Sequence, residues 1–528
     1  MDRVSITLSP TAILAVAILT SYLLWRTFRK SQSLPLPPGP KGLPIVGNLY
    51  DLPPEGSVDF LEFAKHRDLY GPISSLKVVG TTIILLNDKQ CAVDILDKES
   101  AKTASRPEST FAYEYAGFKK SLALTRDRRL FREYRKVMAK VLGSRNAVMK
   151  FHPQQELEAQ KFLLRLLKDP EHYPEHLRRE AGAFILKVTY GYSIIPEGID
   201  PLVTLSESLL ERFVYATAPG KWLVDLIPQV QYIPEWFPGG GYKKSGRKVE
   251  AVVQEVIEKP LAFTIHQRKQ NKHVPSYASD LLDDNEPHDM VSWTSMGMYI
   301  AGADTTVASL KGFLLAMILF PSAQRKAQDE IDRVVGRDRL PLLSDRDNLP
   351  YINAMVKEVM RWHTPGPIAL PHRADEDIIY RGYLIPKGAT IMVNAWLYNN
   401  DPSYYADPRK FSPERFLKDE NHEPETDPTE NIFGWGRRIC PGRLVADSAV
   451  FVTMAQTLAA YTISKPIGPD GKPVEPVVDY IPGIVAHLRP FGIDFKLRDP
   501  KYEDIIRTVE KEDSFDSGDA EILAKVKY

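Results

Sequence analysis

The segment FGWGRRICPGR, residues 433 to 443, constrains the fold of this 528-residue chain more than any other stretch. It holds Cys440, one of only two cysteines, between glycines that permit φ angles above zero and the close approach of a flat ligand. A predicted helix begins at Leu444, and its N-terminus and three nearby arginines favour the thiolate form of Cys440. This single sulfur suits one axial bond to a metal already held by a macrocycle, or a catalytic nucleophile that requires a base from elsewhere in the chain.

The cysteine count and the charge balance exclude several classes of protein. With Cys91 as the only other cysteine, neither a disulfide framework nor a cysteine zinc site can form, which fits a folded part that faces a reducing compartment. We expect Cys91 to be a small core residue, because it lies on the apolar face of a helix predicted to begin near Asp88. The formal net charge of zero gives no electrostatic indication of nucleic-acid binding.

The N-terminal segment has the pattern of a membrane anchor. Residues 4–25 carry no charge and are long enough to cross a bilayer as a helix, and the cluster RTFRK that follows favours the cytoplasmic side. A cleaved signal peptide is the alternative, but no small-residue cleavage site precedes Leu24, and the strong positive charge follows the apolar run. We predict an anchor over residues 1–33 and a stiff, proline-rich connector over residues 34–48.

The periodicity of the remaining chain predicts a mainly α protein with small β-sheets, an α+β fold. The expected elements are two strands around Gly80 within residues 72–88, a basic amphipathic helix over 125–142, a long apolar helix over 290–320 that Pro321 ends, a helix over 444–458 and a last hairpin over 487–498. We expect one catalytic domain over residues 49–498, followed by a charge-rich, peripheral tail over residues 499–528.

The sequence AGADTT, residues 301 to 306, is unusual inside the long apolar helix. Asp304 and Thr305 are both poor helix formers, and Gly302 costs about 1 kcal/mol relative to alanine in a helix interior. Taken alone, the pattern fits a kink with locally satisfied polar groups as well as it fits a functional site.

The motifs together resemble those of the cytochrome P-450 superfamily. Phe433, Gly436, Arg438, Cys440 and Gly442 match the family's FxxGxRxCxG haem-binding loop at every defined position. Three further motifs occur in the family's order: AGADTT, EVMR with Glu358 and Arg361, and FSPERF with Arg415. The resemblance covers residues 35–498 and is greatest to fungal microsomal members of secondary metabolism, of the O-methylsterigmatocystin oxidoreductase-like group.

The resemblance implies that the chain binds haem b, with Cys440 as the axial iron ligand. Cofactor contacts would come from Ala301, Phe433, Gly436, Arg438 and Gly442, and the haem propionates would be bound by Arg438, His372 and Arg135, with Arg132 as a further candidate. The chain departs from the family pattern at Phe131, where a tryptophan is common. Because phenylalanine has no indole N–H, we expect one propionate contact to be absent or supplied by water.

The resemblance also implies roles for the other motifs. Thr305 would hydrogen-bond the iron-bound oxygen species and Asp304 would relay protons to it, whereas Glu358, Arg361 and Arg415 would form a buried network that holds the cysteine loop. Substrate contacts would come from residues that could equally be plain core residues: Phe111, Phe118, Ile368, Ala369, Leu370, Ile484 and Val485. Their apolar character predicts a lipophilic substrate.

The implied activity is haem-dependent monooxygenation of a lipophilic small molecule in secondary-metabolite biosynthesis. Electrons would come from NADPH through a separate cytochrome P-450 reductase, and the chain would be a single-pass protein of the endoplasmic reticulum membrane with a cytosolic catalytic domain. A basic face is the candidate surface for docking the reductase: Arg128, Arg129, Lys136, Lys140, Arg437 and Arg443.

Two alternatives belong to other functional classes. A haem-thiolate isomerase, dehydratase or peroxygenase would need no external electrons, but such relatives often lack the acid–alcohol pair that is intact here. A non-catalytic haem sensor would need neither that pair nor a membrane anchor. Dependence of turnover on reductase and dioxygen discriminates between these classes.

Overall fold

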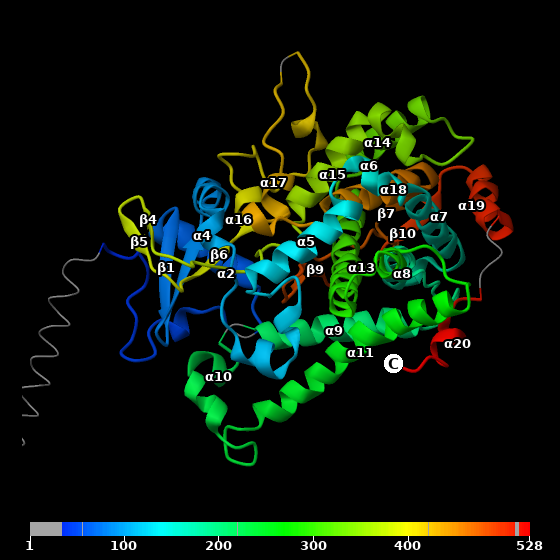
Figure 1. Cartoon of the computed structure of the whole chain (residues 1–528). Helices are drawn as coiled ribbons and strands as arrows, with labels where there is room; N and C mark the ends of the chain where they lie inside the picture. The colour runs from blue at the N-terminus through cyan, green and yellow to red at the C-terminus, as the bar shows by residue number, and fades with distance from the viewer. Residues whose placement is uncertain (1–33, 55, 219, 421, 513–516) are drawn as a thin grey trace, which may run out of the picture.

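The computed structural model shows a mainly helical body with small β-sheets, the largest of which lies at one side (Figure 1). It describes residues 34–54, 56–218, 220–420, 422–512 and 517–528. The predicted membrane anchor over residues 1–33 lies outside the described residues. The predicted α+β class, with helices dominant, is confirmed.

Helices form most of the body, and several of them are long. The described α-helices are α2 (Asp59–Tyr70), α3 (Lys89–Ala92), α4 (Ser100–Thr103), α5 (Arg128–Leu142), α6 (Arg145–Met149), α7 (His152–Lys168), α8 (Tyr173–Tyr190), α9 (Pro201–Thr217), α10 (Leu223–Leu226), α11 (Tyr242–Lys269), α12 (Tyr277–Asp283), α13 (His288–Leu319), α14 (Pro321–Val334), α15 (Pro350–Trp362), α16 (Ala395–Asn399), α17 (Thr429–Ile432), α18 (Arg443–Ala460), α19 (Lys501–Glu512) and α20 (Ala520–Leu523). Short 3₁₀ or π-helical turns connect them, at Leu49–Asp51, Val93–Lys98, Phe111–Tyr115, Phe118–Lys120, Pro170–His172, Pro228–Tyr232, Leu343–Asn348, Pro413–Phe416 and Gly436–Arg438.

The strands form one four-stranded sheet and three two-stranded sheets. They are β1 (Ile73–Val78), β2 (Thr81–Leu86), β3 (His372–Arg373), β4 (Ile378–Tyr380), β5 (Tyr383–Ile385), β6 (Thr390–Val393), β7 (Tyr461–Ser464), β8 (Tyr480–Ile481), β9 (His487–Leu488) and β10 (Asp494–Leu497). The larger sheet has the order β1-β2-β6-β3, in which β2 and β6 run parallel and the other pairs are antiparallel. The smaller sheets pair β4 with β5, β7 with β10 and β8 with β9.

The predicted hairpin around Gly80 is confirmed, whereas the predicted last hairpin is wrong. Val79 and Gly80 have φ angles of 45° and 86°, the left-handed turn that joins β1 to β2 in antiparallel register. In the segment 487–498, β9 pairs with β8 and β10 pairs with β7, so the two strands belong to different sheets. Alternation of polar and apolar residues predicted strands here but could not identify their partners.

Helix α5 begins three residues later than predicted, for a local reason. Asp127 caps its N-terminus, because the carboxylate accepts hydrogen bonds from the backbone N–H groups of Arg129 and Leu130. The expected apolar face is buried, including Tyr134 and Val137, while the basic residues other than the half-buried Arg135 lie toward solvent.

Helix α13 is the central helix of the body (Figure 1). It packs against α8, α15 and α18, and Pro321 starts the next helix immediately after it, as the sequence predicted. It is also the one described helix that is long and apolar enough to span a membrane, yet 67% of its most apolar stretch is buried in the protein. It is therefore a core helix of the body.

Both ends of the described chain are attached to the body. In the connector, the backbone N–H of Ser75 donates to the Pro38 carbonyl at 2.8 Å, so residues 34–48 run beside β1. In the C-terminal segment, α19 places Tyr502, Ile506 and Val509 in the main core. The expectation of a peripheral tail is therefore wrong for α19, whose apolar residues recur at helical spacing among many charges.

Candidate functional site

The cysteine loop connects α17 to α18 and is closed by backbone hydrogen bonds. The N–H of Cys440 donates to the carbonyl of Phe433 at 2.7 Å. Gly436 has a φ of 55°, and a Cβ there would lie 2.3 Å from the Leu96 carbonyl oxygen. Its N–H donates to the Asp97 carboxylate at 2.6 Å. Gly436 is therefore required by the turn and by the close packing of the loop on residues 93–98.

Gly442 has a different environment from Gly436. Its φ is negative, and a Cβ added there would meet only the Cys440 sulfur among protein atoms of the described chain, at 3.9 Å. Neither the backbone conformation nor a neighbouring protein atom therefore requires glycine at this position. The space beside the sulfur is free for a ligand that approaches the backbone closely.

The protonation state of Cys440 differs from the sequence-based expectation. Burial raises the pKa of the Cys440 thiol, although the backbone N–H of Gly442 and the charge of Arg135 act in the opposite direction. The helix N-terminus and the arginines are where they were predicted, but desolvation outweighs them. A bound metal would remove the thiol proton, because a coordinating thiol is deprotonated by the charge of the ion.

A cluster of basic side chains lies beside the loop, in which Arg106 is buried and Arg438 is partly buried. Arg438 donates to the backbone carbonyls of Ala104 at 2.6 Å and Thr125 at 2.7 Å. Arg106 donates to the carbonyls of Leu370 at 2.6 Å and Pro371 at 2.8 Å. Among the described residues, neither guanidinium forms an ion pair with a carboxylate, although the charge of Asp375 partly offsets that of Arg438. Such uncompensated buried charges are costly, so the cluster is suited to an anionic ligand.

Burial lowers the pKa values of the basic groups in this cluster. Burial lowers the pKa of Arg438 to about 10 and that of Arg106 to about 9, and the charge of Arg438 lowers the latter further. Burial lowers the pKa of His372 to about 3, with a further contribution from Arg106. An anion bound here would stabilise the protonated forms of all three groups.

Of the other two predicted propionate ligands, Arg135 and Arg132, only Arg135 contacts the cysteine loop. Arg135 is half-buried, and its Nη1 donates to the carbonyl of Ile439 at 2.8 Å, next to Cys440. Arg132 is exposed and donates only to the Arg128 carbonyl of its own helix, so the structure does not bring it to the site. Arg106 was missed by the sequence reasoning, since a lone arginine before a proline in a loop carries little signal.

Phe131 interacts with the site through its aromatic ring and not as a hydrogen-bond donor. Its ring lies under the guanidinium of Arg438, with 3.8 Å between the guanidinium carbon and the ring centroid. This cation–π contact holds Arg438 in place without an indole N–H. The substitution for the common tryptophan therefore keeps the arginine positioned while it removes one donor.

The polar residues of α13 interrupt its burial. Ala301 and Thr305 are exposed, although the helix is otherwise largely buried on both sides of them. The hydroxyl of Thr305 donates to the Ala301 carbonyl at 2.9 Å, which satisfies it locally in this state. A Cβ at Gly302 would lie 2.8 Å from the Ile185 side chain on α8, so a larger residue at position 302 would need that side chain to move.

Asp304 has a partner that the sequence did not indicate. Its Oδ2 lies 2.9 Å from Nε2 of His487, and the two side chains are 26% and 23% exposed. The two residues are 183 positions apart, on α13 and β9. A contact between residues so far apart in the sequence cannot be recognised from a local motif.

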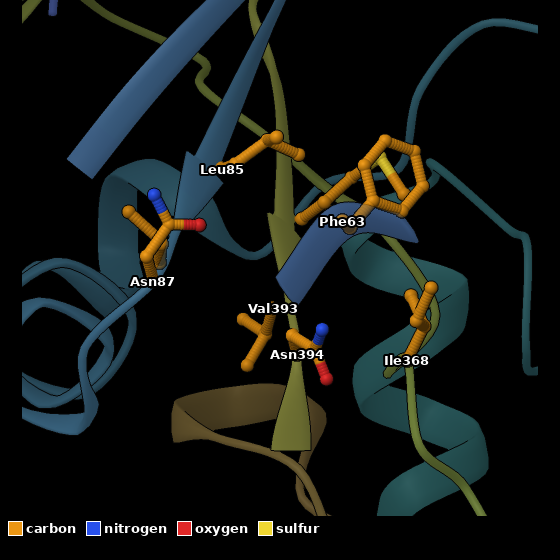
Figure 2. A pocket seen from close by; sticks show the side chains of 8 residues that line it. Phe63, Leu85, Asn87, Ile368, Val393 and Asn394 are labelled. Carbon is orange, nitrogen blue, oxygen red and sulfur yellow. The ribbon is translucent and has the colours of Figure 1, made fainter. Parts of the chain in front are cut away.

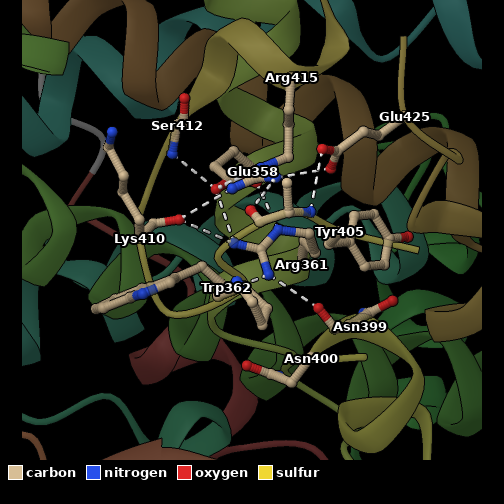
Figure 3. Close-up of polar contacts among 12 residues, drawn as sticks. Glu358, Arg361, Trp362, Asn399, Asn400, Tyr405, Lys410, Ser412, Arg415 and Glu425 are labelled. Carbon is tan, nitrogen blue, oxygen red and sulfur yellow. Dashed lines mark hydrogen bonds and ion pairs between the residues drawn. The ribbon is translucent and has the colours of Figure 1, made fainter. Parts of the chain in front are cut away.

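Glu358, Arg361 and Arg415 form one buried charge network (Figure 3). Arg361 binds both carboxylate oxygens of Glu358, at 2.7 and 2.8 Å, and Arg415 Nε lies 3.1 Å from Glu358. Glu425 is a fourth member that the sequence reasoning missed, with its carboxylate 2.6 Å from Arg415. The second carboxylate balances the charge of the second arginine.

A chain of hydrogen bonds connects this network to the cysteine loop. Arg361 donates to the backbone carbonyl of Asn399 at 2.8 Å. Asn431 Nδ2 donates to the side-chain oxygen of Asn399 at 2.8 Å, and Asn431 lies two residues before Phe433. The start of the loop is thus attached to α15 through buried polar groups.

The aromatic residues proposed to contact substrate are covered by other side chains. Phe111 is fully buried and stacks on Trp222 with 3.6 Å between ring centroids. Phe118 is 1% exposed and packs edge-on against Phe213. In this conformation both are core residues.

The remaining proposed substrate residues are partly exposed. Ile484 and Val485 lie in the turn before β9, and Leu370 supplies its carbonyl to Arg106. Ala369 packs against the core beside the larger sheet. Ile368 lines a cavity of about 10 Å³ with Phe63, Asn87 and Asn394, shown in Figure 2. This volume holds at most one water molecule, so the cavity is no substrate pocket.

The predicted basic docking face is partly neutralised. Arg128, Arg129 and Lys140 form ion pairs with Asp375, Glu133 and Asp284, at 2.8, 3.1 and 3.0 Å. For Lys136, Arg437 and Arg443, no acidic partner occurs among the described residues.

The residues present fit a haem-thiolate cofactor. Cys440 offers one sulfur beside the free space at Gly442, and Arg106 and Arg438 lack the negative charges that two propionates would supply. Cys440 precedes α18, which packs against α13, the helix that exposes Ala301 and Thr305. The arrangement places a sulfur, basic side chains and an acid–alcohol pair on neighbouring elements.

Comparison with known proteins agrees with this geometry. Residues 37–484 match the family model described as cytochrome P-450. A cytochrome P-450 monooxygenase of Ampulloclitocybe clavipes is 44% identical over 94% of this chain and 92% of its own length. A multifunctional cytochrome P-450 monooxygenase of Aspergillus fumigatus is 39% identical, covering 93% of each chain. O-methylsterigmatocystin oxidoreductase of Aspergillus flavus is 38% identical, covering 97% of each chain.

Proposed function

This chain belongs to the cytochrome P-450 family as a monooxygenase, and from that premise we propose that it oxidises a lipophilic small molecule in secondary-metabolite biosynthesis. The observation that carries the site assignment is the pair of guanidinium groups that form no ion pair with a carboxylate of the described chain, the buried Arg106 and the partly buried Arg438, the latter two residues before Cys440. We assign haem b to this place, with Cys440 as the axial iron ligand. When bound, the haem supplies the dioxygen activation and oxygen insertion that no side chain can perform.

The residues of the chain bind and orient the cofactor. Arg438, Arg106 and Arg135 would hold the propionates as positively charged donors, with His372 as a further hydrogen-bonding group. The Phe131 ring holds the guanidinium of Arg438 in place through the cation–π contact. Arg132 is left out of this set, because its side chain is directed along its own helix.

Proton delivery is assigned to α13. Asp304 would pass protons toward the hydroxyl of Thr305, which donates to the Ala301 carbonyl in this structure and would have to leave that carbonyl to donate elsewhere. The Glu358–Arg361–Arg415 network would have a supporting role. Through Asn399 and Asn431 it would hold the cysteine loop at the position that the sulfur requires.

The cellular setting is proposed from the sequence and from the relatives. Residues 1–33 would form a single-pass anchor in the endoplasmic reticulum membrane, with the catalytic domain, residues 49–498, in the cytosol. Electrons would come from NADPH through a separate cytochrome P-450 reductase. Lys136, Arg437 and Arg443, whose charges are not paired within the described chain, are the best candidates to attract it.

The substrate class is proposed from the apolar side chains near the site. Ala369, Leu370, Ile484 and Val485 are partly exposed and apolar, so they favour a lipophilic substrate. Phe111 and Phe118 could contribute only after Trp222 and Phe213 move away from their rings.

The proposal is tested by comparing Thr305→Ala with Thr306→Ala as a control in the same helix. With reductase, NADPH and dioxygen, Thr305→Ala should release most reducing equivalents as hydrogen peroxide, while Thr306→Ala should remain coupled to product. Fully coupled turnover of Thr305→Ala would contradict its assigned role. Turnover without reductase or dioxygen would contradict the proposed oxygen insertion itself and favour an isomerase or dehydratase.

A further inference from the structure

The partner of Asp304 suggests how its carboxylate is supplied with protons. His487 Nε2 lies 2.9 Å from Asp304 Oδ2, within hydrogen-bond distance. The two come from separate elements, α13 and β9, which pack against each other. Two groups of complementary chemistry thus meet at the one acid that the proposed function places next to Thr305.

The strand that carries His487 is held firmly in this register. Ile481 of β8 pairs with His487, and the backbone N–H of His487 donates to the Val485 carbonyl at 3.0 Å. The preceding residue, Ala486, is buried and donates its N–H to the Pro365 carbonyl at 2.9 Å. His487 is therefore a positioned side chain on regular structure.

Solvent can reach this histidine, whereas its nearest histidine neighbour is fully enclosed. The side chain of His487 is 23% exposed. His363 is fully buried, and burial lowers its pKa to about 4, with a further contribution from the charge of His487. His363 is therefore neutral at physiological pH and cannot exchange protons with water as easily as His487 can.

A second set of charged groups lies within electrostatic range of Asp304. Glu207 on α9 is ion-paired with Arg178 at 3.3 Å, and Lys311 is buried further along α13. The charge of Asp304 contributes to the electrostatic environment of both Glu207 and Lys311. These groups are the alternative route by which protons could reach Asp304. Among the described residues, none of them makes a hydrogen bond to Asp304.

We propose that His487 and Asp304 form a proton-relay pair, with His487 as the residue that positions the carboxylate and recharges it from solvent. The inference rests on the proposed function of Asp304 and Thr305. The N–H of His487 Nε2 gives its proton to Asp304 Oδ2 while Nδ1 takes up one from water, so the total charge of the pair rises by one. Asp304 then releases a proton toward Thr305, and the imidazole returns to its first tautomer by exchange with solvent. No electrons move in these steps.

The experiment compares His487→Gln, His487→Ala and Asp304→Asn in the haem-loaded full-length protein. His487→Gln keeps a donor for Asp304 but cannot carry a proton, so product formed per NADPH should fall about tenfold or more, with an increased solvent deuterium isotope effect. His172→Ala is the matched control, since His172 forms an exposed pair with Asp169 at 2.9 Å. It should change neither quantity.

A spectroscopic readout separates positioning from general damage. The infrared stretching band of carbon monoxide bound to the reduced protein responds to the electric field on the α13 side of the site. His487→Ala should shift this band in the same direction as Asp304→Asn, and the double variant should add no further shift. His487→Gln should leave the band close to its wild-type position and remain testable if His487→Ala does not fold.

The outcomes distinguish the relay from the function on which it rests. Normal coupling and an unshifted band in both His487 variants would overturn the relay, while uncoupling in Asp304→Asn would leave the proposed role of Asp304 intact. Coupling that survives in His487→Gln would also overturn proton transfer by His487. A loss that appears only with Glu207→Gln or Lys311→Met would assign the route to those groups. Full coupling of Asp304→Asn would contradict the proposed function itself.

Discussion

Removal of the negative charge at the centre of the buried network should be the most costly single change in the protein. Glu358 is fully buried and accepts hydrogen bonds from Arg361 at 2.7 and 2.8 Å, from Arg415 at 3.1 Å and from the backbone N–H of Ser412 at 2.7 Å. Glu358→Gln would leave the charge of Arg361 uncompensated in the interior. Loss of one partner of a buried pair costs about 3–5 kcal/mol, or roughly a 10²- to 10⁴-fold smaller folded-to-unfolded ratio.

The assay is urea unfolding of haem-loaded protein, followed by circular dichroism, with the haem absorption recorded in parallel. Because Asn399 and Asn431 connect the network to the cysteine loop, haem should be lost at lower urea concentration than in the wild type. Glu423→Gln is the control, since Glu423 pairs with Lys418 in an exposed position and should matter little. Equal stability and haem retention in Glu358→Gln and Glu423→Gln would refute the argument.

Three further predictions concern separate parts of the molecule. Gly436→Ala should reduce haem content and destabilise the protein by about 1–3 kcal/mol, because residue 436 has a positive φ and lies against the Leu96 carbonyl. Gly471→Ala is the control, since Gly471 also has a positive φ but lies in open space, and it should retain full haem content. Equal haem loss in the two variants would contradict this reasoning. Burial raises the pKa of Glu180 to about 8 and thus favours the protonated carboxyl in the folded protein. The contribution of this protonated form to stability should be lost as pH rises through that value. Glu180→Gln should therefore flatten the decline in stability between pH 5 and pH 8, measured by thermal unfolding; an unchanged slope would count against it. Lys136→Glu should slow reduction by the reductase in stopped-flow absorbance without altering substrate affinity, and an unchanged rate would contradict docking at this face.

Local motifs predicted the parts of the site whose residues lie close together in sequence. The Glu358–Arg361 pair lies three residues apart on one helix, a spacing that brings side chains together wherever the helix packs. The glycines around Cys440 indicated a tight loop before a helix, and both the loop and α18 are present. Such features depend on backbone geometry within one or two turns.

Features that depend on tertiary contacts could not be predicted in this way. His487 meets Asp304 across 183 residues, and Arg106 joins the cluster only because the chain returns at residues 370 and 371. The pKa of Cys440 was expected to be low from its charged neighbours, but burial reverses the direction. Burial is a property of the complete fold and is invisible in an eleven-residue segment.

The charges of the C-terminal segment concealed its structural role. Three apolar residues of this segment recur at intervals of four and three positions and pack in the main core: Tyr502, Ile506 and Val509. Composition predicted a solvated tail, whereas periodicity indicates an amphipathic helix. For this segment the periodicity is the better guide, because a helix needs only one apolar face to pack.

The most direct test of the central claim is the absorption spectrum of the reduced protein with carbon monoxide, recorded beside Cys440→Ser. The account predicts a strongly red-shifted Soret band in the wild type that disappears in Cys440→Ser, because only a thiolate ligand pushes sufficient electron density onto the haem iron. An unchanged red-shifted band in Cys440→Ser, or no such band in folded, haem-replete wild type, would contradict the assignment of Cys440 as the axial ligand.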